Sequence, residues 1–302
     1  MNAKKALLLA LKLAISALSL YLVFSKTDIN KVFSILKSVG PFYFLIAASL
    51  YVVSQFVSSV RWKLLLPEKF MLRRLFSLYM IGGFFSSFLP GVIGGDVVKA
   101  YYLNKDAKKI SLTLASVFMD RYLGYVSLMI IGIAAFPFSM RFFGASVYKW
   151  AMPLIFISFI AGSFLFFGLQ LGRRFKVVAE FYEYFVSLKE RKDVMFKAVM
   201  LFLFIQAIGI TTVAMLAWAM GQDIPVLLLF AFLPIVITIT SLPISISGLG
   251  VREGSFVVLL GMIGVKPEAA TSLSLSWFFS SVLGSLPGLV AYFRHTSGSV
   301  EG

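Results

Sequence analysis

The chain contains no cysteine, and its only histidine is His295. Without cysteine there is no disulfide, no thiolate nucleophile and no thiolate metal ligand. His295 stands near the C-terminus with no other metal-ligating residue close in sequence. The sequence therefore predicts no redox chemistry on the protein side, no metal site and no cofactor.

Charge is also scarce, since only 14% of the 302 residues are charged. Acidic residues are fewer than basic ones, with 13 Asp and Glu against 28 Lys and Arg, so the net charge is +15. The cations are scattered between apolar runs and do not form one basic module, which argues against nucleic acid as a partner. Anionic membrane lipids are the expected partner of this positive charge.

Long polar stretches are absent as well. Hydrophobic residues make up 60% of the chain, and the mean hydropathy is +0.93, which is too apolar for the surface of a water-soluble protein. The composition predicts an all-α, polytopic membrane protein in which residues 1–302 form one integral membrane domain. Six apolar runs match the roughly 20 residues that a bilayer crossing needs. They lie at about 6–24, 42–66, 110–136, 150–170, 198–220 and 268–293.

Two further apolar stretches, at about 76–103 and 224–263, are interrupted by proline and glycine. Nearly the same pattern recurs 153 positions apart, with Pro90 matching Pro243 and Lys99 matching Arg252. Backbone that is not helical at membrane depth must face protein or a water-filled cavity. We predict two re-entrant broken-helix hairpins whose breaks fall at Pro90, Gly91, Gly94, Gly95, Pro243, Gly248 and Gly250. The sequence leaves open whether the longer arm of the second stretch, 224–242, crosses the membrane fully. The side of the membrane on which the C-terminus lies depends on that crossing.

The same offset maps the elements of one half of the chain onto those of the other. Repeat one covers about 1–136, and repeat two covers about 150–293. Three spans separate the two hairpins, so the hairpins open to opposite faces and the repeat is predicted to be inverted. Lys and Arg concentrate in alternate loops, which predicts a multi-pass protein of the cytoplasmic membrane with its N-terminus in the cytoplasm.

The candidate site residues surround these breaks. Short helices are expected to restart at about Asp96 and Val251, with free N–H groups directed into the membrane interior. Lys99 and Arg252 lie within about the first turn of these helices, and three more charges fall in or beside apolar segments: Asp120, Arg121 and Glu253. Together with Asp96, they form the predicted binding site for an anionic group. Two alternatives stay open at this stage: ordinary helix kinks with snorkelling cations, or a fixed interhelical ion pair.

Neighbouring positions on a helix diverge by about 100°, so Asp120 and Arg121 are not expected to pair with each other. For Arg121, the expected partner is Asp96 or a substrate phosphate. Arg61 and Lys63 are interpreted as interfacial anchors. Gln55 and Gln206 are interpreted as interhelical hydrogen-bonding groups, and the aromatic belt is assigned Trp62, Tyr148 and Trp150. Residues 173–193 are predicted to form an amphipathic helix along the cytoplasmic interface.

The two motifs resemble those of a known family. The first motif, residues 85–101, contains Leu89-Pro90-Gly91 and Gly94-Gly95-Asp96. The second, residues 242–254, reads Gly-Leu-Gly-Val-Arg-Glu-Gly from 248 to 254. Both are similar to motifs of the flippase-like transmembrane domain of bacterial lysyl-phosphatidylglycerol synthases. Members tend to carry an acidic residue before arginine in the span after the first motif, here Asp120-Arg121. The resemblance implies movement of a lipid across the membrane. Aminoacyl transfer is not expected, because the chain ends at Gly302 without the soluble catalytic domain of the synthases.

These observations favour a lipid translocase for an anionic phospholipid or a polyprenyl-phosphate lipid, and not an enzyme. Two other functions stay open. One is an intramembrane transferase that acts on prenyl-linked sugars, with Asp96, Asp120 or Glu253 as a general base. The other is an accessory subunit of a separately encoded lipid-modifying enzyme. A homo-oligomer also stays open, and the lipid, the direction of movement and the energy source are not specified by the sequence.

Overall fold

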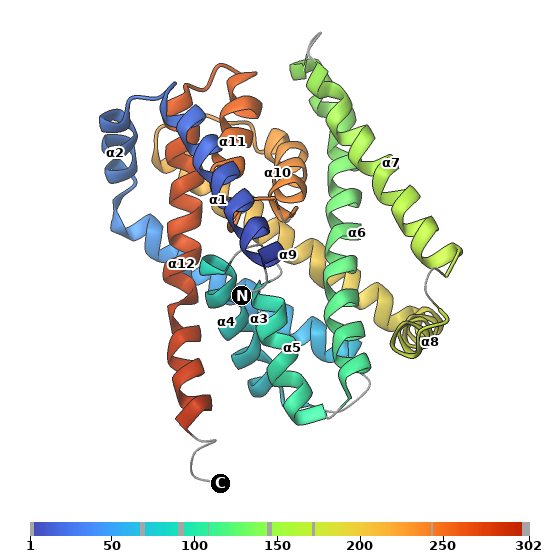
Figure 1. Ribbon diagram of the computed structural model, residues 1–302. Helices are drawn as coiled ribbons and strands as arrows, with labels where there is room; N and C mark the ends of the chain where they lie inside the picture. Colours follow the sequence, from blue (N-terminus) through green and yellow to red (C-terminus); the bar gives the residue numbers. More distant parts are fainter. Residues whose placement is uncertain are drawn as a thin grey trace.

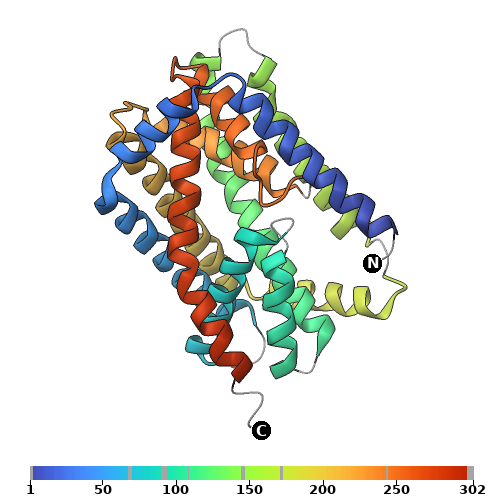
Figure 2. The same cartoon turned by 60° about the vertical axis from the view of Figure 1, so that its left-hand side comes forward.

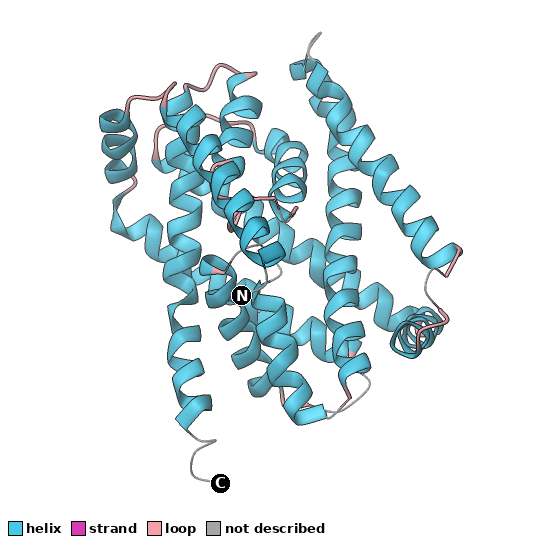
Figure 3. Cartoon of the chain, in the orientation of Figure 1, coloured by secondary structure: helices cyan, strands magenta, loops and turns pink. Residues whose placement is uncertain are grey.

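The computed structural model describes residues 3–66, 70–89, 94–107, 109–143, 147–170, 173–242 and 244–297. All regular structure in these ranges is helical (Figure 3), as predicted. The α-helices are α1 (Ala3–Phe24), α2 (Ile29–Ser38), α3 (Gly40–Leu65), α4 (Leu72–Phe88), α5 (Gly94–Ala107), α6 (Ile110–Phe143), α7 (Ala151–Ser163), α8 (Lys176–Glu190), α9 (Lys192–Ala219), α10 (Val226–Ser241), α11 (Val251–Gly261) and α12 (Pro267–Ser297). A 3₁₀ turn, Val147–Trp150, precedes α7, and a π-helical turn, Phe164–Gly168, extends it.

Five of the described helices are long and apolar enough to cross a membrane: α3, α6, α7 with its π-helical extension, α9 and α12. They correspond to five of the six predicted spans, and the chain is a multi-pass membrane protein. The predicted first span differs, because α1 and α2 form a pair bent by 87° that together passes the same test. Asp28 makes the bend by capping α2, and its Oδ1 accepts hydrogen bonds from the backbone N–H groups of Asn30 and Lys31.

The two interrupted stretches each form a pair of short helices. In the first, α4 has 17 residues, and in the second, α10 has 16. At a rise of 1.5 Å per residue each is about 25 Å long, less than the roughly 30 Å of hydrocarbon. The returning helices α5 and α11 begin at Gly94 and Val251, close to the predicted restarts. The predicted breaks at Pro90, Gly91 and Pro243 lie outside the described residues.

The two pairs occupy opposite ends of the molecule (Figures 1 and 2). The α4–α5 pair lies toward the end where α12 finishes and where α8 lies across the long helices, which we call the α8 end. The α10–α11 pair lies toward the other end. The two breaks meet between them, because the Ser247 hydroxyl lies 3.0 Å from the carbonyl oxygen of Ser86 and 3.1 Å from that of Leu89.

Glycine permits the closest helix contacts. A Cβ atom at Gly95 would lie 1.9 Å from the carbonyl oxygen of Gly82, so α5 packs directly on the backbone of α4. A Cβ atom at Gly288 in α12 would lie 2.0 Å from the carbonyl oxygen of Met80, which lies in α4 like Gly82. These contacts hold α4 closely between α5 and α12.

The α8 segment confirms the predicted amphipathic helix. Phe181, Tyr184 and Leu188 are buried against α6 and its neighbours, while the other face of the helix is exposed. The Tyr184 hydroxyl donates to the backbone carbonyl of Leu65 at 2.7 Å. Burial raises the pKa of this phenol above its usual value.

The interpretation of Trp62 as part of an aromatic belt is wrong. Its side chain is fully buried and packs in a cluster with Leu75, Leu78 and Leu103. Trp62 stands at the end of an apolar run, and the sequence does not reveal that α4 and α5 cover this face of α3. Trp150 is 57% exposed, as an interfacial residue requires. The side chain of Tyr148 lies outside the described residues.

Candidate functional site

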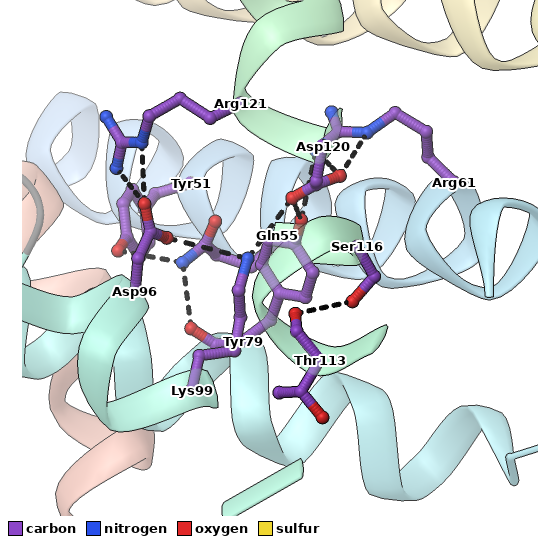
Figure 4. A network of polar contacts seen from close by, with 10 residues as sticks. All are labelled: Tyr51, Gln55, Arg61, Tyr79, Asp96, Lys99, Thr113, Ser116, Asp120 and Arg121. Atoms are coloured by element: carbon purple, nitrogen blue, oxygen red, sulfur yellow. Dashed lines mark hydrogen bonds and ion pairs between the residues drawn. The ribbon is translucent and has the colours of Figure 1, made fainter. Parts of the chain in front are cut away.

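A cavity of about 310 Å³ lies where α3, α4, α5, α6, α9 and α10 meet. Five charged side chains line it: Arg61, Asp96, Lys99, Asp120 and Arg121. Figure 4 shows them converging from α3, α5 and α6. We call this cavity the charged chamber.

Asp120 is at the centre of one half of this network. Its Oδ1 atom accepts hydrogen bonds from the Arg61 guanidinium at 2.7 and 3.0 Å, and its Oδ2 atom lies 3.1 Å from the Lys99 ammonium. The Tyr79 hydroxyl also donates to Oδ2. The side chains of Arg61, Lys99 and Asp120 are 4–6% exposed. Because charges buried this deeply require partners, the four groups form one interdependent unit.

Asp96 and Arg121 form the other half. The Arg121 Nε atom donates to Asp96 Oδ2 at 2.6 Å, and the Asp96 Oδ1 atom lies 3.6 Å from the Lys99 ammonium. Unlike Asp120, this pair is partly open, with 29% of the Arg121 side chain and 20% of the Asp96 side chain exposed. Asp120 and Arg121 therefore have different partners, as predicted, and Arg121 has the expected partner Asp96.

Uncharged groups complete the wall. The Gln55 amide donates to the Tyr51 hydroxyl at 3.0 Å and to the Tyr79 carbonyl at 3.3 Å, which confirms its interhelical role. Gly83 faces these two side chains, and a Cβ atom there would lie 2.3 Å from the Tyr51 hydroxyl oxygen. Gln206 from α9 and Ser241 from α10 also line the chamber, so the arm that leads to the second break contributes to it.

The interpretation of Arg61 as an interfacial anchor is wrong. The residue is 4% exposed, pairs with Asp120, and places its guanidinium carbon 3.3 Å from the ring centroid of Phe202. Asp120 lies inside a predicted span, and no cation was predicted as its partner. A carboxylate at membrane depth requires a cationic partner, so Asp120 by itself indicated that a neighbouring span supplies a buried Lys or Arg. Lys63, by contrast, is exposed.

Arg252 and Glu253 form a separate cluster and do not line the charged chamber. The Arg252 guanidinium donates to Glu253 at 2.7 Å and to Ser274 at 3.1 Å, and it stacks on Phe278. Glu253 is fully buried and also accepts from the Gly250 backbone N–H at 2.7 Å, which caps α11. The second motif cation therefore stabilises its break, whereas its counterpart Lys99 faces the chamber.

Gly248 and Gly250 are required by the backbone at the second break, with φ angles of +75° and +80°. A Cβ atom at Gly250 would also lie 2.6 Å from Cβ of Ser19 in α1. Gly94 and Gly95 begin α5 at the first break and let it approach α4. The glycines that the structure describes at the two breaks thus serve turn geometry and close packing.

The chamber is suited to an anion. Its three cations face two carboxylates, which leaves one net positive charge, and Arg61, Lys99 and Asp120 are at most 6% exposed. Within the described residues, no three His, Asp or Glu side chains come together in a way that could hold a metal ion. These side chains hydrogen-bond to one another and pair their charges.

A comparison with curated proteins found no match. A comparison with protein-family models matched residues 9–288 to the model described as the lysylphosphatidylglycerol synthase TM region. The match spans both broken helix pairs and every charged residue of the chamber. The chain therefore belongs to the lysylphosphatidylglycerol synthase transmembrane-region family.

Proposed function

We propose that this protein is a lipid translocase that moves an anionic phospholipid or a polyprenyl-phosphate lipid between leaflets. The observation that carries the proposal is the charged chamber, which places three cations and two carboxylates beside the meeting point of two helix breaks. A lipid phosphate that enters this chamber would neutralise its one net positive charge.

The physical problem in lipid movement is the cost of taking a charged headgroup through hydrocarbon, which is several kcal/mol or more for one charge. Arg121 and Lys99 can offset that cost by ion pairing with phosphate, and a guanidinium suits a phosphate because it donates two parallel hydrogen bonds. Arg121 is the more accessible of the two cations, with 29% of its side chain exposed. We assign it the first contact with the headgroup.

We further propose that the chain is an inverted repeat, with repeat one at about 1–136 and repeat two at about 150–293. The opposite placement of the two broken helix pairs supports this arrangement (Figure 2). It would give a headgroup a related approach from each leaflet, with the charged chamber between them. The end of α3, the start of α4 and the whole of α8 lie at the α8 end (Figure 1), and they carry the exposed cations Lys63, Arg73 and Lys189. This positive charge favours a cytoplasmic location for that end.

The described carboxylates favour transport over catalysis. A general base must be free to accept a proton from the substrate. Asp120 is bound by Arg61, Lys99 and Tyr79, and Glu253 caps a helix while pairing with Arg252. Asp96, the third candidate base, is more exposed, but its carboxylate is paired with Arg121 and Lys99. We therefore propose no enzymatic activity, and we take the anionic membrane lipid as the partner.

The test is a translocation assay in liposomes that contain the purified protein. A headgroup-labelled anionic phospholipid reports movement through its accessibility to a quencher that cannot cross the membrane. Arg121→Gln removes the most accessible chamber cation, and it should lower the protein-dependent rate at least about tenfold, a loss of about 1.4 kcal/mol of stabilisation. Lys105→Gln is the matched control, because Lys105 stacks on Tyr101 on the surface and does not line the chamber.

An equal loss in both variants would mean that general surface charge drives the rate. If the unaltered protein moves neither an anionic phospholipid nor a polyprenyl phosphate, the translocase proposal is wrong for these lipids. A labelled polyprenyl phosphate in a parallel series separates the two lipid classes.

A further inference from the structure

A second cavity, about 510 Å³ in volume, adjoins the charged chamber on the side of α5, α6 and α8. Its wall is almost entirely apolar, and Val97, Leu114, Phe118 and Phe181 are among its lining residues. Val97 is 62% exposed and Leu114 is 48% exposed, so this surface is open to the surroundings of the protein. An exposed apolar surface on a membrane protein is chemically suited to lipid chains. We call this cavity the α5/α6/α8 groove.

The groove and the charged chamber share two residues, Asp96 and Arg121. Those residues form the ion pair at 2.6 Å that is more exposed than the Asp120 network. The pair thus stands at the boundary between an apolar surface and a polar interior. The apolar groove on one side of this boundary suits a hydrocarbon chain, and the charged chamber on the other side suits a charged headgroup.

Asp96 holds the position that an incoming phosphate would need. It lies in the first turn of α5, where backbone N–H groups favour an anion, and it contacts both Arg121 and Lys99. Asp120 cannot be exchanged in the same way, since it is bound by Arg61, Lys99 and Tyr79 and is 6% exposed. Of the two chamber carboxylates, Asp96 is the one that a substrate anion can displace.

We infer that the α5/α6/α8 groove is the lateral portal through which an anionic lipid reaches the charged chamber, with the lipid phosphate displacing Asp96 from Arg121. One hydrocarbon chain lies against α5, α6 and α8 while the headgroup passes the ion pair. The inference rests on the proposed function, and it specifies the path of the lipid and names Asp96 as an internal competitor of the substrate anion.

The first test measures where the lipid chain lies. Phe118→Trp puts an indole into the groove, and lipids with brominated chains quench it on contact. The four native tryptophans are accounted for by the same titration of the unaltered protein. Brominated phosphatidic acid should half-saturate the quenching at a lower mole fraction than brominated phosphatidylcholine with the same chains. Equal quenching by both lipids would mean that bulk lipid merely fills the groove, and it would overturn the inference.

The second test adds Asp96→Asn to the Phe118→Trp protein. Loss of the competing carboxylate should lower the half-saturating fraction of phosphatidic acid about tenfold and leave that of phosphatidylcholine unchanged. Asp28→Asn is the matched control, because it removes one carboxylate at an exposed pair with Lys31 far from the groove in sequence and fold. If Asp96→Asn weakens the binding of phosphatidic acid or leaves it unchanged, Asp96 is not a competitor.

The third test blocks the portal. Val97→Trp fills the groove at an exposed position and should slow translocation at least tenfold, whereas Val290→Trp, at an exposed site on α12 that is 53% accessible, should not. Translocation that stays fast with Val97→Trp overturns the portal and leaves the translocase intact. Selective, Asp96-dependent quenching in a protein that moves no lipid supports the anion-selective groove and refutes the translocase.

Discussion

The ion pair between Arg61 and Asp120 provides a strict test of the structure, because the two residues are 59 positions apart and the sequence assigned Arg61 a different role. Asp120→Asn keeps the size of the side chain and removes its charge. Arg61 and Lys99 then face a neutral amide while 4–5% exposed. Removal of one partner from a buried ion pair costs about 3–5 kcal/mol, so we expect the free energy of unfolding to fall by that amount.

A double-mutant cycle isolates the contribution of the pair. Arg61→Met alone should also be costly, because it removes the main partner of Asp120 and the contact with the Phe202 ring. The double variant leaves neither a buried guanidinium nor a buried carboxylate, so its cost should be less than the sum of the single costs by about 1.5 kcal/mol or more. The measurement is the unfolding free energy in mixed micelles titrated with sodium dodecyl sulfate, compared among the four proteins.

Asp28→Asn serves as the control for a lost carboxylate. It breaks an exposed 3.7 Å pair with Lys31, while the amide oxygen of asparagine can still cap α2, so it should cost less than about 1 kcal/mol. If Asp120→Asn costs no more than this control, or if the two single costs simply add, then Arg61 and Asp120 are not energetically coupled. Arg61 would in that case be the interfacial anchor that its sequence position suggests.

Three further variants test other parts of the structure. Gly95→Ala should prevent normal folding, because the new Cβ atom would lie 1.9 Å from the Gly82 carbonyl oxygen, and the measurement is the yield of monodisperse protein. Gly209→Ala, where the new Cβ atom meets open space, is the control. Glu253→Gln should lower the unfolding free energy by about 3–5 kcal/mol, since it removes the carboxylate that pairs with the buried Arg252. An unchanged value would contradict the role assigned to this cluster. Tyr184→Phe should cost about 1 kcal/mol through the lost hydrogen bond to the Leu65 carbonyl. Burial also raises the pKa of the Tyr184 phenol, so the stability that the neutral phenol contributes is complete below the usual tyrosine pKa of 10.0 and is lost as pH rises above it. Tyr184→Phe should therefore lose less stability in alkali than the unaltered protein.

The predicted residues that line the charged chamber share one physical property. Lys99, Arg121 and Asp96 stand in or beside apolar segments, where an ionisable side chain is costly and is retained for pairing or transport. Helix geometry predicted that Arg121 does not pair with its neighbour Asp120, and Asp96 was one of the two partners expected for Arg121. Arg61 was missed because it is near the end of a span, where arginine commonly reaches the membrane surface.

The sequence by itself determined that this is an all-α membrane protein with a broken helix pair in each half. Those features depend on local properties, namely the length of apolar runs, the lack of helical hydrogen bonding at proline, and the backbone freedom of glycine. Only the tertiary structure decided that Lys99 and Arg252 have different surroundings, although they occupy equivalent positions in the two motifs. Lys99 faces Asp120 from α6, whereas Arg252 is held by its own neighbour Glu253 and by Ser274 from α12. Which side chains share a chamber depends on how distant helices pack, and no local pattern specifies that.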